Sequence, residues 1–120
     1  PVAHAMTDVT GFGLAGHVRA ICDTSGLDAD LWQQAIPIYA GAQALSDAGV
    51  SSNLMPSNRV DAPVEGVQDA LLHDPQTSGG LLAAVPEAQS AAVSAALKAE
   101  GCAGHVIGRL IKGSGRLYLT

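Results

Sequence analysis

HAMTDVTGFGLAGH, residues 4–17, places one carboxylate, Asp8, three residues before a Gly-x-Gly turn that opens onto an apolar-periodic segment. A carboxylate oxygen suits a hard cation such as Mg²⁺. Glycine lets the backbone approach an anion because it lacks a Cβ. The N–H groups at the start of a following helix would point at that anion. The stretch therefore predicts a metal–phosphate site, with Asp8 as metal ligand and Thr10, Gly11 and Gly13 as phosphate or substrate contacts.

A second glycine loop, DPQTSGG, occupies residues 74–80. Hydroxyls beside flexible backbone form a good nest for an anion, which makes Thr77, Ser78, Gly79 and Gly80 further candidates for phosphate or substrate binding. Each loop also has a purely structural interpretation. Asp8 would then cap a helix or form a turn, and the second loop would deliver the chain into a strand. Two such loops in one small domain favour the hypothesis that they meet across a site.

The periodicity of apolar residues predicts an alternation of helices and strands. We expect helices over residues 11–24, 37–48 and 86–100, because glycine follows the end of each. We expect strands over 27–32, 81–85, 105–111 and 116–119, the second buried and the last two joined by a hairpin-like turn at 112–115. Residues 51–63 read as a loop, and 64–72 as either a short helix or a strand. This mixture predicts an α+β or α/β layered domain.

The composition indicates one compact domain spanning residues 1–120, because hydrophobic residues make up 48% and charged residues only 14%. A net charge of −5 without a cluster of lysine and arginine argues against nucleic-acid binding. No apolar run approaches the roughly 20 residues that span a membrane. The widely spaced Cys22 and Cys102 favour free thiols in the cytoplasm. Because its strongest motif stands at the start, we expect the chain to be a fragment that lacks an N-terminal part.

Other polar residues near these loops have weaker signals. His17 lies within the first predicted helix and would face the site, and His73 could orient Asp74. The Asn58-Arg59 pair is a candidate phosphate clamp, because arginine presents a planar fork of donors. For each of them, an ordinary core or surface role is the alternative. No arrangement of Ser, His and Asp, or of Cys and His, indicates a catalytic nucleophile.

The two glycine loops resemble the signatures of one enzyme family. TDVTGFGL at residues 7–14, followed by Gly16-His17, is similar to the segment that opens the C-terminal domain of selenophosphate synthetases (selenide, water dikinases). DPQTSGGLL at residues 74–82 resembles the second signature of that family. The wider superfamily includes aminoimidazole ribonucleotide synthetase, and its members carry their own versions of an Asp-plus-glycine motif. The full TDVTGFG string favours the selenium enzyme.

The resemblance implies an α/β/α layered domain with a mixed sheet, partly ferredoxin-like. It implies an enzyme that makes selenophosphate from ATP, selenide and water, releasing AMP and phosphate, with Mg²⁺ required and Asp8 among its metal ligands. The reactive Cys or selenocysteine and most nucleotide contacts would lie in the absent N-terminal domain, so no catalytic residue is assigned here and the fragment alone would be inactive. A homodimer is implied as well. The rival interpretations are the matching domain of another ATP enzyme of the superfamily, and a non-catalytic phosphate-binding module.

Overall fold

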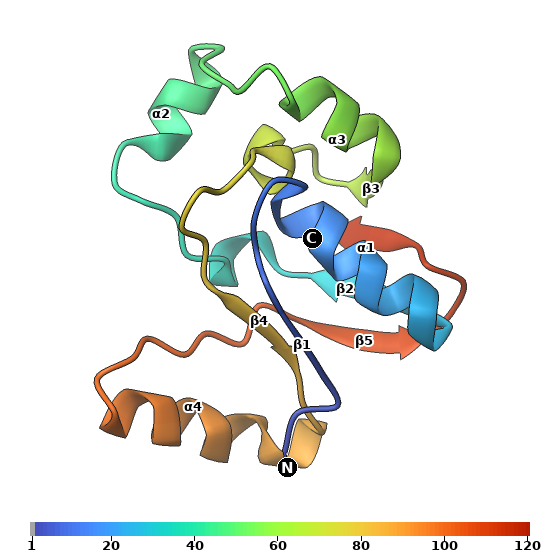
Figure 1. Ribbon diagram of the computed structural model, residues 1–120, viewed down its shortest axis with the longest axis vertical. Coiled ribbons are helices and arrows are strands. Elements are labelled where there is room, and N and C mark those ends of the chain that lie inside the picture. The colour runs from blue at the N-terminus through green and yellow to red at the C-terminus, as the bar shows by residue number, and fades with distance from the viewer. Residues whose placement is uncertain (1) are drawn as a thin grey trace.

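The computed structural model describes residues 2–120 (Figure 1). The α-helices are α1 (Gly13–Ser25), α2 (Ala42–Asp47), α3 (Met55–Asp61) and α4 (Ser90–Ala99). The strands are β1 (Ala5–Asp8), β2 (Leu27–Leu31), β3 (Val64–Gly66), β4 (Leu81–Ala84), β5 (Gly108–Lys112) and β6 (Leu117–Leu119). Short 3-10 helices are η1 (Gln33–Ala35), η2 (Ala70–His73) and η3 (Glu87–Gln89).

The strands form two sheets. β1 and β4 make an antiparallel two-stranded ribbon in which Asp8 lies opposite Leu81. The other four strands form a mixed sheet in the order β3-β6-β2-β5, where β2 runs antiparallel to β5 and parallel to β6. The expected α+β class with a mixed sheet is therefore confirmed. None of the helices within residues 2–120 is both long and apolar enough to cross a membrane.

The core lies between α1 and the middle of the mixed sheet, which runs behind that helix in Figure 1. Small side chains at Ala15, Val18 and Cys22 on α1 let the helix lie close to the strands. The facing side chains are Ala29 and Leu31 of β2 with Leu117 and Leu119 of β6. The first predicted helix is thus confirmed, and it stops where expected, at a left-handed Gly26 with a φ of 65°.

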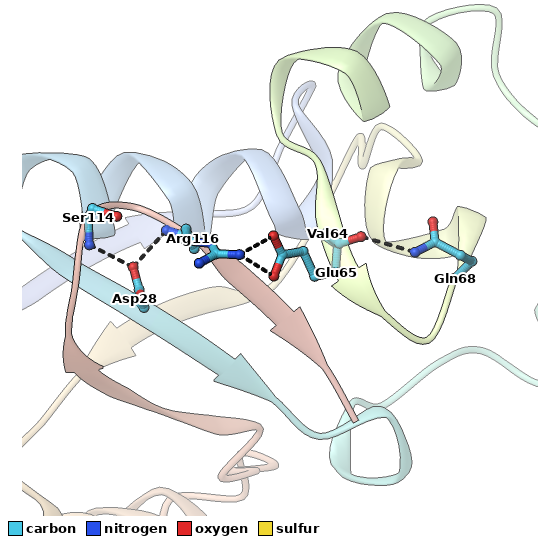
Figure 2. Close-up of polar contacts among 6 residues, drawn as sticks. All are labelled: Asp28, Val64, Glu65, Gln68, Ser114 and Arg116. Atoms are coloured by element: carbon cyan, nitrogen blue, oxygen red, sulfur yellow. Dashed lines mark hydrogen bonds and ion pairs between the residues drawn. The ribbon is translucent and has the colours of Figure 1, made fainter.

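The predicted hairpin between the last two strands is wrong, because β2 lies between β5 and β6. The turn at residues 113–116 instead wraps around the start of β2 (Figure 2). The carboxylate of Asp28 accepts hydrogen bonds from the backbone N–H groups of Ser114, at 2.7 Å, and Arg116, at 2.8 Å. The alternation of apolar and acidic residues over 27–32 is typical of a half-exposed strand with Asp28 on its outer face, but Asp28 is buried because this turn covers it. Arg116 also forms an ion pair with Glu65 of β3 (Figure 2).

Three other predicted elements differ from the structure. The second helix begins at Ala42 rather than residue 37, because Gly41 has a φ of 84°, which an α-helix cannot contain. Residues 51–63 are not all loop. They include α3, whose Pro56 stands in the first helical turn, where a missing N–H costs little. The strand at Leu81 is not buried, since it pairs only with β1 and its alternate side chains face outward.

Other predictions fare better: strands are present as β2, β5 and β6 where they are predicted over 27–32, 105–111 and 116–119, although β5 begins only at Gly108. The ambiguous segment 64–72 contains both a strand, β3, and the start of a 3-10 helix, η2. The Ala-rich helix is confirmed as η3 followed by α4, and the left-handed Gly101 follows its end with a φ of 77°. α4 carries no buried side chain.

Candidate functional site

The two glycine loops lie side by side. We call residues 9–13 the first glycine loop and residues 74–80 the second. The backbone N–H of Val9 donates to the carbonyl oxygen of Gly80 at 3.0 Å, and the N–H of Gln76 donates to the carbonyl oxygen of Thr10 at 3.0 Å. The first contact continues the pairing of β1 with β4, which run side by side in Figure 1, and the second lies beyond that pairing. The predicted meeting of the loops is thus present in the fold, and it is made by the backbone.

Two of the candidate glycines are required by packing. A Cβ on Gly79 would overlap the carbonyl oxygen of Val9, so only glycine allows the loops to approach this closely. Gly13 has a φ of 73°, and a Cβ there would lie 2.8 Å from the carbonyl oxygen of Leu72. Gly11 and Gly80 are different, because a Cβ on either would have no atom within 4 Å. The space beside their Cα atoms is therefore open to an incoming ligand.

Asp8 lies at the end of β1, directly before the first glycine loop. Its side chain is exposed, and its carboxylate makes no hydrogen bond or ion pair with any of the described residues. It shares the outer face of the ribbon with Met6 and Leu81, which are 64% and 75% exposed. Its free carboxylate oxygens have the chemistry of a ligand for a hard cation. Residues 2–120 contain no group of three or more His, Cys, Asp and Glu side chains able to hold a metal ion, and the metal-binding role of Asp8 stays a prediction.

His17 of α1 contacts the first glycine loop through its imidazole ring. Its Nε2 accepts a hydrogen bond from the backbone N–H of Thr10 at 3.0 Å and lies 3.3 Å from the hydroxyl oxygen of the same residue. A ring nitrogen that accepts carries no proton, so His17 is neutral when it makes this bond. Its ring lies 5.6 Å from the ring of Phe12, which is largely exposed. The predicted approach of His17 to the site is therefore present, in a supporting position.

The second glycine loop is anchored at its start and exposed at its centre. The carboxylate of Asp74 accepts a hydrogen bond from the N–H of Ser52 at 3.3 Å, which ties this end to the segment before α3. His73 makes no hydrogen bond to Asp74 among the described contacts. Thr77 and Ser78 are exposed, so their hydroxyls are free to meet a ligand. Their role as phosphate contacts stays a prediction.

Sequence reasoning missed the part that Asn58 plays. Its side chain is buried, with an exposed fraction of 6%, and its Nδ2 donates to the carbonyl oxygens of Gly11, at 2.9 Å, and His73, at 3.0 Å. The neighbouring Arg59 is exposed, and its part in the predicted clamp stays a prediction. No spacing in the sequence links Asn58 to Gly11, 47 residues away. Only the apolar residues that neighbour this short helix could have suggested that one of its polar side chains is buried.

His73 is a second buried polar residue at this junction. Its side chain is 2% exposed, and its Nδ1 has no hydrogen-bond partner among residues 2–120. Burial lowers the pKa of His73, and the positive charge of Arg59 lowers it further, against a smaller opposing effect of Asp69. The imidazole is therefore held neutral beneath the loops.

The family model for the C-terminal domain of AIR synthase related proteins matches residues 2–119. The chain belongs to this family. Selenide, water dikinase from Cronobacter sakazakii is 42% identical over 111 residues, which are 88% of this chain and 32% of that protein. Selenide, water dikinase from Burkholderia pseudomallei is 38% identical over 100% of this chain and 36% of its own length. The chain thus spans about a third of the length of these relatives.

A solved structure supports the fold. The crystal structure of tt0281 from Thermus thermophilus superposes with a TM-score of 0.63 over 98% of this chain and 32% of that one, at 24% identity. At this identity the likeness concerns the fold alone. The sequence resemblance to selenophosphate synthetases is confirmed by the relatives, which carry that activity in their names.

Proposed function

We propose that this chain is the C-terminal domain of a selenide, water dikinase, which makes selenophosphate from ATP, selenide and water and releases AMP and phosphate. The selenophosphate would serve the synthesis of selenoproteins and of selenium-containing tRNA. The observation that carries the proposal is the contact between the two glycine loops, whose sequences resemble the signatures of that family. The identity of 37% to 44% to several selenide, water dikinases supports it.

Within that enzyme, we assign the metal-binding role to Asp8. Its exposed carboxylate, free of partners among residues 2–120, fits one position in the oxygen shell of Mg²⁺. The cation, when bound, would neutralise charge on the phosphate oxygens during phosphoryl transfer. The open space at Gly11 and Gly80 would admit the transferred phosphate, and the exposed hydroxyls of Thr77 and Ser78 would orient it.

The rest of the active site would come from a preceding ATP-binding domain of the same polypeptide. That domain would carry the Cys or selenocysteine nucleophile, and the complete enzyme would form a homodimer in the cytoplasm. The chain's span of about a third of its relatives supports a further domain. So does the outer face of the β1–β4 ribbon, where exposed apolar side chains at Met6 and Leu81 flank Asp8.

Product analysis of the complete protein tests the proposal. The protein is incubated anaerobically with Mg²⁺-ATP and selenide, and the products are followed by ³¹P NMR. We expect a selenide-dependent selenophosphate signal together with AMP. Asp8→Asn should abolish it, because the amide removes the negative charge that holds the cation. Asp47→Asn, at an exposed position on α2, serves as the matched control and should retain activity.

The other products have distinct meanings. Conversion of ATP to ADP without selenophosphate would replace this proposal with another ATP enzyme of the superfamily, such as one related to aminoimidazole ribonucleotide synthetase. ATP left intact by a folded protein would indicate a non-catalytic phosphate-binding module. Full activity in Asp8→Asn would leave the enzyme in place and remove Asp8 from the metal site.

A further inference from the structure

The side chain of Asn58 lies where three parts of the molecule meet. It projects from α3 and is buried against the first glycine loop on one side and the end of η2 on the other. Both of its hydrogen-bond partners are carbonyl oxygens, which can only accept. The side-chain nitrogen, with its two N–H donors, must therefore face them, and both donors are used. An amide in this position satisfies two buried acceptors at once.

Its two acceptors belong to the two halves of the proposed site. The Gly11 carbonyl lies three residues after Asp8, and the His73 carbonyl directly precedes the second glycine loop. The loops touch each other through two backbone bonds, from Val9 to Gly80 and from Gln76 to Thr10. The bridge through Asn58 adds a third connection, from Gly11 in the first loop to His73, the residue before the second. It therefore limits how the first loop can tilt relative to the second.

No other side chain within residues 2–120 makes this connection. His17 holds only the first loop, through Thr10. Asp74 holds only the second loop, through Ser52. The remaining buried polar side chain at the junction, His73, leaves its Nδ1 without a partner. The relative placement of the two loops thus depends on their backbone pairing and on Asn58.

We propose that Asn58 is a positioning residue for phosphoryl transfer, whose amide fixes the first glycine loop, and with it Asp8, relative to the second. The proposal rests on the function proposed above. Asn58 does not touch the substrate. It acts through the Gly11 carbonyl, so its loss should loosen the geometry in which Asp8 and the second loop meet a metal-bound phosphate. A small displacement of such groups is costly in phosphoryl transfer, where catalysis is mostly positioning.

The test compares Asn58→Ala with Val18→Ala in the complete protein. Val18 is a core residue of α1 that contacts neither loop in the hydrogen-bond network, so its truncation lowers stability without removing the bridge. Each variant is assayed at a temperature where circular dichroism shows it folded. The readouts are kcat, and the Mg²⁺ concentration that gives half-maximal rate. The second does not depend on how much of the enzyme is active.

We expect Asn58→Ala to lower kcat by about tenfold or more and to raise the half-saturating Mg²⁺ concentration severalfold, since two hydrogen bonds are lost. Val18→Ala should leave the Mg²⁺ requirement unchanged. Hydrogen exchange gives a readout without turnover, because the N–H of Gln76 should exchange faster in Asn58→Ala than in Val18→Ala. If Asn58→Ala does not fold, Asn58→Ser replaces it, since a hydroxyl keeps one donor and should give an intermediate effect.

Two results would overturn the proposal. One is an Asn58 variant that is folded and keeps the wild-type Mg²⁺ requirement and Gln76 exchange, which would make the bridge structural only. The other is an equal rise in Mg²⁺ requirement in Val18→Ala, which would show that any loss of stability has this effect. Absence of selenophosphate from the wild-type protein is a different failure, because it contradicts the proposed function and not the bridge.

Discussion

Replacing Gly79 with alanine tests the close approach on which the site depends. The added Cβ would overlap the carbonyl oxygen of Val9, and Gly79 has no left-handed backbone that would strain alanine by itself. The overlap can be relieved only if the second glycine loop moves away from β1. That movement breaks the two bonds between the loops, from Val9 to Gly80 and from Gln76 to Thr10. At about 1 kcal/mol for each bond, the expected loss in the free energy of unfolding is about 2 kcal/mol.

The neighbouring glycine provides the control. A Cβ on Gly80 meets no atom within 4 Å. The free energy of unfolding of Gly80→Ala should therefore lie within about 1 kcal/mol of the wild-type value. It should be the higher of the two if the reduced backbone freedom of the unfolded chain dominates. Urea denaturation followed by the fluorescence of Trp32, the only tryptophan, measures both variants. Two outcomes would refute the reasoning. The first is a Gly79→Ala variant as stable as the wild type, and the second is an equal loss in Gly80→Ala, which would point to general glycine flexibility.

Three further predictions concern buried groups. The pKa of His73 is lowered in the folded state, so stability should fall as the pH drops below its ordinary value of 6.5, and urea midpoints of His73→Phe should lack this component. The backbone N–H groups of Arg116 and then Ser114 lower the pKa of Asp28. The wild type should therefore be more stable than Asp28→Asn near neutral pH. Thermal scans should show this difference in stability shrinking as the pH falls below about 4. Burial, assisted by nearby carboxylates, raises the pKa of the Cys22 thiol to about 11, so a maleimide should label only the exposed Cys102 in the native chain and both thiols in urea.

The sequence is informative wherever a signal is local. The helix that ends at Gly26 follows from apolar spacing and a left-handed stop, and both are present. The meeting of the glycine loops could also be anticipated, because two similar anion-type loops in a small domain suggest a shared site. The loops are brought together by the antiparallel pairing of β1 with β4. The residue pattern of neither strand shows which strand it will pair with. Partner choice between strands is a tertiary property.

The predictions that failed depend on contacts between residues far apart in the sequence. A glycine-rich turn between two apolar segments is the ordinary signal for a hairpin. Here Asp28 captures two backbone N–H groups of that turn from 86 and 88 residues away, and β2 takes the place between the two strands. The alternation of Leu27 to Trp32 marks Asp28 as solvent-facing, and nothing local reveals that a later turn will cover it. The bridging role of Asn58 could not be predicted for an equivalent reason, since both of its acceptors lie in other parts of the chain.

The geometry of the glycines narrows where an anion can be bound. A glycine-rich motif is usually read as if every glycine served the ligand, but in this chain Gly13 and Gly79 are explained by the close approach of neighbouring backbone. Their substitution would damage the fold and therefore says little about phosphate contact. Gly11 and Gly80 carry no such packing requirement, and they flank the free carboxylate of Asp8 in sequence and across the ribbon. Adding a side chain at these two open positions therefore separates binding from folding in this motif. The decisive result is a loss of affinity for phosphate or Mg²⁺ in a protein whose stability is unchanged.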